Sequence, residues 1–99
     1  MNPQKVRREQ VRKLEDLPNI GKAMAADLRL IGIEMPQHLR EREAFEMYEM
    51  LCARSGQRHD PCVIDVFMSI VSFMRGGAAL PWWAFTAERK RRLHGSVRP

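Results

Sequence analysis

The apolar positions of this chain recur with the spacing of α-helices and nowhere alternate as they do in β-strands. The most apolar stretch follows Asp60 and Pro61, a carboxylate that can cap free amides and a residue that has no amide to cap. The stretch continues to Met74, is apolar almost all round and ends at Gly76, which is typical of a buried central helix. The pattern predicts an all-α protein, a compact bundle of about five helices.

Shorter segments with helical periodicity surround this central one. They cover about residues 2–16, 22–31, 35–40, 43–53 and 86–93, of which 35–40 is a single turn. Gly32 and Gly56 end two of them at positions suited to a left-handed cap, and Thr86 is placed to cap the last. Pro18 cannot continue a helix and pushes Leu17 out of helical dihedral angles, so a tight turn should separate the first two segments.

The chain length of 99 residues is that of a single domain, which we expect to span residues 1–99 with frayed ends at about 1–10 and 94–99. The apolar run from Val66 to Met74 is half the length that a bilayer crossing requires. The basic residues near the N-terminus have no apolar run behind them, unlike those of a secretory signal. These features predict a cytoplasmic protein without a membrane partner, in which Cys52 and Cys62 are thiols.

The charge of the chain is unevenly distributed. The 17 basic and 12 acidic side chains give a net charge of +5. Cations are in excess in residues 1–33 and 76–99, whereas residues 34–75 are acidic overall. Such a distribution suits a polyanionic partner, with nucleic acid ahead of an acidic membrane surface, but many basic faces are simply solvated. Charge alone therefore leaves nucleic-acid binding as a hypothesis.

The turn Leu17-Pro18-Asn19-Ile20-Gly21-Lys22 resembles the hairpin of a helix-hairpin-helix element, which binds the nucleic-acid backbone without reading its sequence. Gly21 would let a phosphate approach the backbone closely, and a buried Ile20 would lock the turn. The amides of residues 20–23 would then point outward from the positive end of a helix dipole, which is a phosphate site. Asn19 stands where the family usually has glycine, and asparagine tolerates the positive φ that the turn requires.

The candidate nucleic-acid-binding residues are the hairpin and the nearest cations: Pro18, Asn19, Ile20, Gly21, Lys22, Ala23, Arg12 and Lys13. The resemblance also implies that hairpin carbonyls can hold a monovalent cation that bridges to phosphate, and we expect no other cofactor. The family usually carries two such elements and this chain shows one, so dimerisation, an accessory role and a structural hairpin that binds a protein all stay open. A turn of this composition is also a common helical corner without a ligand.

A wider resemblance covers about residues 11–92. Several separated motifs occur in the order found in the bacterial pathogenicity-locus family of helix-hairpin-helix-related proteins, many of which are labelled mitomycin-resistance proteins. The motifs are Leu-Pro-Asn-Ile-Gly at 17–21, Asp-Leu-Arg-Leu-Ile-Gly-Ile at 27–33, Met-Tyr-Glu-Met-Leu-Cys at 47–52, Arg-His-Asp-Pro-Cys-Val-Ile-Asp-Val at 58–66 and Pro-Trp-Trp-Ala-Phe-Thr at 81–86. The chain is also similar to the C-terminal domain of bacterial competence regulators. The resemblance implies the fold more than an activity, and it leaves any link to mitomycin open.

Two other groups of residues could carry chemistry. Cys52, His59, Cys62 and Asp65 have the side chains of a zinc site, but their spacing is not that of a known ligand set, so we expect no metal. Cys62 follows Asp60 at a helix N-terminus, where the helix dipole lowers a thiol pKa and the Asp60 charge opposes this effect. Asp65 lies within the apolar helix and needs a hydrogen-bond donor, for which we expect Arg54, Arg58 or a tryptophan indole.

The leading hypothesis is a small non-catalytic module that contacts the DNA phosphate backbone, without sequence specificity, through its hairpin. The alternative is a protein-interaction adaptor with a structural hairpin, whose partner binds a methionine or tryptophan surface. A thiol-based enzyme at Cys62 is the third. Trp82 and Trp83 either cover the end of the core, which is the preferred interpretation, or stack on exposed bases.

Overall fold

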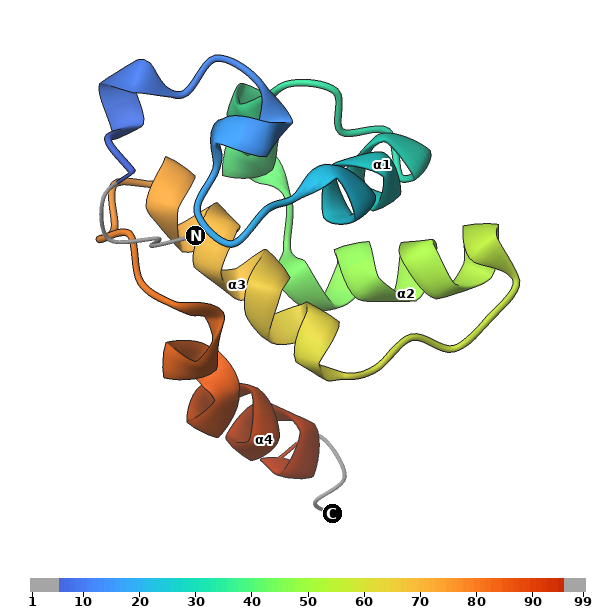
Figure 1. The fold of residues 1–99 in the computed structure, drawn as a ribbon. Coiled ribbons are helices and arrows are strands. Elements are labelled where there is room, and N and C mark those ends of the chain that lie inside the picture. Colours follow the sequence, from blue (N-terminus) through green and yellow to red (C-terminus); the bar gives the residue numbers. More distant parts are fainter. Residues whose placement is uncertain (1–5, 96–99) are drawn as a thin grey trace.

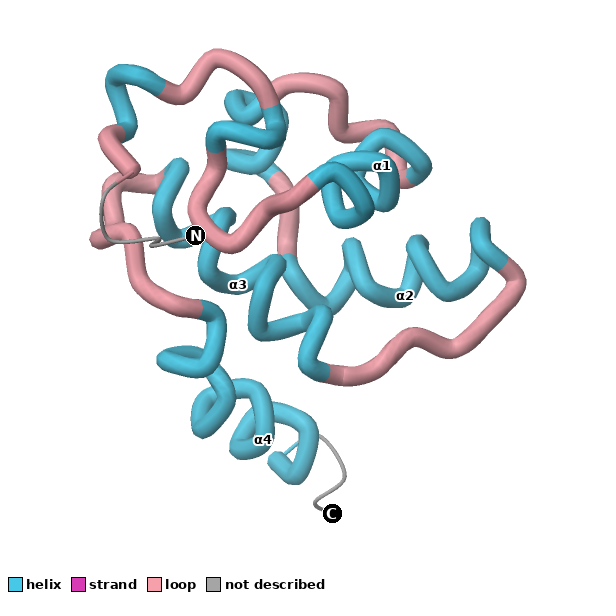
Figure 2. Tube along the Cα trace, in the orientation of Figure 1, coloured by secondary structure: helices cyan, strands magenta, loops and turns pink. Residues whose placement is uncertain are grey.

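The computed structural model describes residues 6–95, and the expectations for residues 1–5 and 96–99 lie outside the described residues. Four α-helices run through this part of the chain: α1 Lys22–Leu30, α2 Ala44–Ser55, α3 Cys62–Met74 and α4 Thr86–Gly95 (Figure 1). Short 3-10 helices precede or connect them: η2 Arg8–Gln10, η3 Leu14–Asp16, η4 Pro36–Glu41 and η5 Trp82–Phe85. Residues 6–95 contain no strand, which confirms the all-α fold class (Figure 2).

Helix α3 lies in the middle of the molecule, as its apolar sequence predicts (Figure 1). The Asp60 carboxylate accepts a hydrogen bond from the Cys62 amide at 2.8 Å and so caps the start of the helix. Residues 64–71 are buried without interruption. Helices α2, η4, η5 and α4 all pack on α3. Gly32 and Gly56 follow α1 and α2 with positive φ, which confirms the expected left-handed caps.

Residues 6–16 do not form the basic helix that the sequence predicts for residues 2–16. The chain makes two separate 3-10 turns, with extended backbone at Val11 and Lys13 between them. The Asp16 carboxylate accepts hydrogen bonds from the amides of Arg12 and Lys13 at 3.0 and 3.1 Å. A side chain thus takes the amides that a continuous helix would bond to carbonyls, which is how short polar side chains compete with helices. The buried Leu14 anchors the segment on the core.

Arg8 holds the beginning of the described chain against the end of α3. Its guanidinium donates to the carbonyl of Phe73 at 2.8 Å and to that of Gly77, and it lies 4.9 Å from the centre of the Phe73 ring. The last carbonyls of a helix lack intrahelical partners and carry the negative end of its dipole, so a cation stabilises them. Arg8 therefore packs on the end of α3, within the stretch 1–10 that the sequence predicts to be frayed.

Other arginines also donate to main-chain carbonyls, at helix ends or in the connection before α2. These hydrogen bonds run from Arg40 to Met74, from Arg42 to Ile31, from Arg54 to Leu30, and from Arg75 to Arg40 and Arg42. Part of the positive charge that composition offers to a polyanion thus serves helix capping. Arg40, Arg54 and Arg75 nevertheless stay exposed and keep their charge.

Candidate nucleic-acid interface

The hairpin at residues 17–21 joins η3 to α1, and buried side chains anchor it on the core. Leu17, Pro18 and Ile20 are buried. Asn19 has a φ of 68°, the positive value that the sequence predicts. The Ile20 amide donates to the Leu17 carbonyl at 3.4 Å and closes the turn. The predicted burial of Ile20 is therefore confirmed, but the prediction that its amide points outward is wrong, because the turn itself uses that amide.

The Asn19 side chain ties the hairpin to two distant segments. Its Nδ2 atom donates to Ser69 Oγ at 3.1 Å and to the Leu80 carbonyl at 2.9 Å. Ser69 in turn donates to the Val66 carbonyl within α3 at 2.6 Å. Glycine has no side chain for these bonds, so asparagine makes the turn of this chain more rigid. The sequence carries no local signal for either partner, because they lie 50 and 61 residues away.

The first turn of α1 leaves main-chain amides without a partner in the helix. Gly21 is the N-cap residue in extended conformation, and no side chain caps the helix. The Ala25 amide donates to the Gly21 carbonyl at 3.0 Å, so the amides of Lys22 and Ala23 precede the helical ladder. Residues 21–23 are exposed, and a Cβ added to Gly21 would meet no atom within 4 Å. An anion can therefore approach these two amides from solvent.

Three of the candidate residues are exposed cations. Lys22 stands at the start of α1, whereas Arg12 and Lys13 precede η3. The hairpin follows η3, so the three cations flank it along the chain. Lys22 thus stands next to the free amides in the chain, whereas Arg12 and Lys13 are exposed cations on the other side of η3 in sequence.

Two carboxylates lie within the same segment. Glu15 pairs with Arg29 at 3.2 Å. The pKa of Glu15 lies below its ordinary value, mainly because of a main-chain hydrogen bond and secondly because of the hydrogen bond from Arg29. Hydrogen bonds from two backbone amides likewise lower the pKa of Asp16. Both groups are therefore ionised at neutral pH and oppose the positive charge of the cations in this segment.

The buried carboxylate of Asp65 is satisfied by the last helix. It accepts hydrogen bonds from Arg89, from Nε at 2.8 Å and from Nη2 at 3.4 Å, and from the Thr86 hydroxyl at 2.7 Å. The prediction that Asp65 is paired is confirmed, but the predicted donors Arg54, Arg58 and the indoles are wrong. Thr86 is also not the N-cap that the sequence predicts, because it has helical dihedral angles and its hydroxyl serves Asp65. These bonds fix α4 to α3.

The cysteine region offers neither an assembled metal site nor an activated thiol. Among the described residues, no three histidine, cysteine or carboxylate side chains are placed to hold a metal ion. The pKa of the Cys62 thiol is raised, first by its hydrogen bond to Asp60 and then by burial, which outweigh the nearby Arg89. A raised pKa leaves less thiolate at neutral pH, so thiol chemistry at Cys62 is disfavoured.

The two tryptophans differ in their surroundings. Trp82 packs against the core, whereas Trp83 is 63% exposed. The ring centroids are 5.6 Å apart and the planes meet at 83°, which is an edge-to-face arrangement. The pair does not cover the core jointly, as the preferred interpretation requires, because Trp83 lies largely in solvent.

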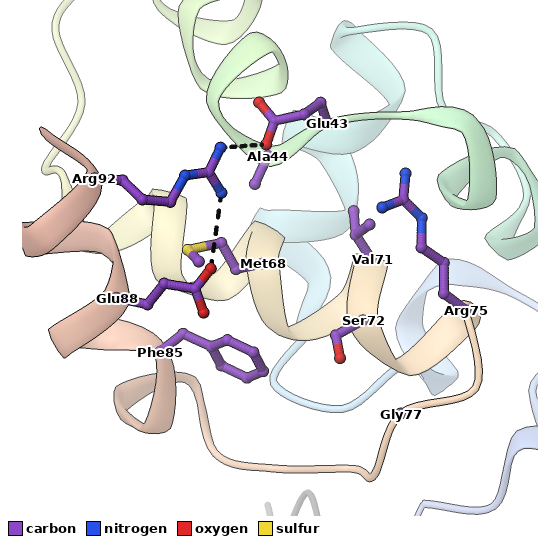
Figure 3. A pocket seen from close by; sticks show the side chains of 10 residues that line it. All are labelled: Glu43, Ala44, Met68, Val71, Ser72, Arg75, Gly77, Phe85, Glu88 and Arg92. Carbon is purple, nitrogen blue, oxygen red and sulfur yellow. Dashed lines mark hydrogen bonds and ion pairs between the residues drawn. The ribbon is translucent and has the colours of Figure 1, made fainter. Parts of the chain in front are cut away.

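Sequence reasoning missed a cavity of about 380 Å³ between the start of α2, the middle of α3 and the η5–α4 segment (Figure 3). Met68 and Phe85 belong to its apolar wall. Arg92 lies at its mouth and pairs with Glu43 at 3.2 Å and with Glu88 at 3.9 Å. The cavity forms only when the three helices pack together, so no local pattern reveals it. Its size is that of a small-molecule site.

The fold and the hairpin define a small all-α protein in which the start of the first α-helix, residues 21–23, is exposed. No helix in residues 6–95 is both long and apolar enough to span a bilayer. Residues 7–91 match the family described as Pathogenicity locus, and the chain belongs to this family, as its motifs predict. Mitomycin resistance protein McrB of Streptomyces lavendulae is 45% identical over 82 residues, which make up 83% of this chain and 78% of that protein. No solved structure matches the chain significantly.

Proposed function

We propose that this protein is a small non-catalytic module that binds the phosphate backbone of DNA, without reading its sequence, through residues 18–23. The observation that carries the proposal is the exposed start of α1, where the amides of Lys22 and Ala23 have no capping side chain. These amides lie at the positive end of the helix dipole, so a phosphate oxygen there gains hydrogen bonds and a favourable potential together. Lys22 adds a full charge beside them.

The rigidity of the hairpin supports the same proposal. The buried Ile20 and the two hydrogen bonds of the Asn19 side chain hold the turn in place before any ligand arrives. A partner therefore does not have to order the loop, which lowers the entropic cost of binding. Main-chain amides contact phosphate oxygens equally well beside every base, so the binding should tolerate any sequence.

The affinity should be weak and strongly dependent on salt. Lys22, Arg12 and Lys13 offer few phosphate contacts, and the ionised Glu15 and Asp16 reduce the attraction. Each phosphate that a cation neutralises releases counterions, so added salt weakens binding in proportion to the number of such contacts. A single hairpin also contacts only a short part of one strand.

Charge reversal at the hairpin should weaken duplex binding by about tenfold at low salt. Lys22→Glu removes the cation next to the free amides and places a repelling carboxylate there. Gly21→Ala should weaken binding without harming the fold, because the added methyl group meets solvent where the phosphate has to approach. Fluorescence anisotropy of a labelled duplex at two salt concentrations measures both effects.

The matched control for net charge is Arg58→Glu, in the exposed loop between α2 and α3. It changes the total charge by the same amount far along the chain from the hairpin and should leave the affinity nearly unchanged. Equal losses in Lys22→Glu and Arg58→Glu would mean that only total charge matters, and the hairpin proposal would fail. Absence of binding at low salt would have the same consequence, and a partner that co-purifies after nuclease treatment would then favour the adaptor.

A second candidate function is the binding of a small organic molecule in the cavity below Arg92. The cavity supports it, as does the 45% identity to a protein named for mitomycin resistance. Titration with mitomycin should shift the methyl NMR signal of Met68, which lines the cavity, and leave that of the exposed Met35 unchanged. An unchanged Met68 signal at millimolar compound would remove this candidate.

A further inference from the structure

The segment from Trp83 to Arg91 carries a stripe of exposed side chains that have no evident role in holding the fold together. The 3-10 helix η5 passes directly into α4, because Thr86 keeps helical dihedral angles between them. Arg89 is buried on the inner side of this continuous helix. Helical spacing places a second set of residues on the opposite, outer side. We call this set the outer stripe; it consists of Trp83, Ala84, Ala87, Lys90 and Arg91, all of them exposed.

Trp83 is the main apolar group of the outer stripe. Its edge-to-face contact with Trp82, which is itself packed against the core, orients its ring and leaves much of the ring surface open. Ala84 and Ala87 are too small to cover it. An aromatic ring that is both oriented and exposed is suited to stack on another flat ring.

The remaining residues of the outer stripe are cations. Lys90 and Arg91 lie about 10–12 Å along the helix axis from Trp83, within reach of the phosphates next to a stacked base. The acidic residue of α4, Glu88, turns away from the stripe toward Arg92 at the mouth of the cavity (Figure 3). A ring followed by two cations without an intervening carboxylate is complementary to a base and its neighbouring phosphates.

We propose that the outer stripe binds unpaired nucleotides, with a base stacked on Trp83 and phosphates at Lys90 and Arg91. The hydrogen bond from Asn19 to the Leu80 carbonyl joins the hairpin to the chain three residues before Trp83 and so links the two surfaces directly. The inference rests on the proposed function, because it takes nucleic acid as the partner. It adds that DNA with unpaired nucleotides is bound more tightly than a plain duplex.

The test compares two single strands that differ only in their bases. One is an oligothymidylate roughly ten nucleotides long, and the other is an abasic deoxyribose-phosphate chain of the same length. Anisotropy at low salt measures the binding of each to the whole protein. The unmodified protein should prefer the oligothymidylate on the order of tenfold. Trp83→Ala should abolish this preference and leave the affinities for the abasic chain and for a duplex unchanged.

Two control variants separate stacking from a general apolar contact. Trp83→Phe keeps an aromatic ring and should retain most of the preference. Leu80→Ala removes a neighbouring exposed apolar side chain that has no aromatic face, and it should retain all of the preference. Equal binding of both strands by the unmodified protein, a preference that survives Trp83→Ala, or an equal loss in Leu80→Ala would overturn the inference. The last result would indicate an apolar surface for a protein partner.

Lys22→Glu, measured in parallel, distinguishes the two proposals. If duplex binding depends on Lys22 and no preference for bases exists, the hairpin proposal stands and the outer-stripe proposal fails. If the preference depends on Trp83 while Lys22→Glu has no effect, the reverse holds. If no strand binds at low salt, both proposals are wrong.

Discussion

Replacing Arg89 by alanine should destabilise the protein by about 3 kcal/mol, because it leaves a buried carboxylate without its charged partner. Asp65 is 0% exposed, and Arg89 reaches both of its oxygens. The Thr86 hydroxyl can satisfy only one of those oxygens once the guanidinium is gone. The free energy of unfolding from urea denaturation, compared with that of the unmodified protein, measures the loss.

The control on the same helix is Arg91→Ala, which removes an exposed cation and should change the free energy of unfolding by no more than about 0.5 kcal/mol. Replacing both Asp65 and Arg89 by leucine should recover much of the lost stability, because no charge then stays buried alone. An Arg89→Ala variant as stable as the unmodified protein would show that water already solvates the pair.

Gly77→Ala should destabilise the protein by about 2 kcal/mol through overpacking. A Cβ at this position would lie 2.5 Å from Ser72 Oγ and 2.9 Å from the Ser72 carbonyl oxygen. That carbonyl accepts the Gly77 amide at 2.8 Å, and the Gly77 carbonyl accepts Arg8, so a shift of the loop would disturb both hydrogen bonds. Urea denaturation again provides the measurement.

Two variants define the cause of this effect. Ser72→Ala in the Gly77→Ala background removes the hydroxyl contact but not the carbonyl contact, so it should restore only part of the stability. Gly21→Ala introduces the same methyl group into open space and should unfold like the unmodified protein. If Gly77→Ala were equally stable, the loop after α3 would have room that the structure does not show.

Helices were predictable from the sequence where local signals agree. Asp60 and Pro61 mark the start of α3, and the glycines at 32 and 56 mark the ends of α1 and α2, because capping involves residues only a few positions apart. The predicted helix is wrong within residues 6–16, because asparagine and proline at the start of the segment favour a helix in the sequence, while the competing Asp16 carboxylate lies at its other end. Helix propensity alone does not decide between such alternatives.

The candidate site was predictable to the same degree. The turn, the positive φ of Asn19 and the buried Ile20 follow from residues that are adjacent in the chain. The hydrogen bonds of Asn19 to Ser69 and Leu80 and the pairing of Asp65 with Arg89 could not be predicted in this way, because these partners meet only in the folded protein. Composition also does not reveal which arginine side chains are held at main-chain carbonyls by the fold.

The contact between Arg8 and the carbonyls at 73 and 77 bears on how the protein is made. Synthesis proceeds from the N-terminus, so Arg8 leaves the ribosome long before its acceptors have been added to the chain. The Arg8 side chain therefore has no acceptors until residues 73 and 77 have been translated. Completion of this domain is accordingly an event that follows most of its own synthesis, and a nascent chain that stops before residue 73 would lack the acceptors of Arg8.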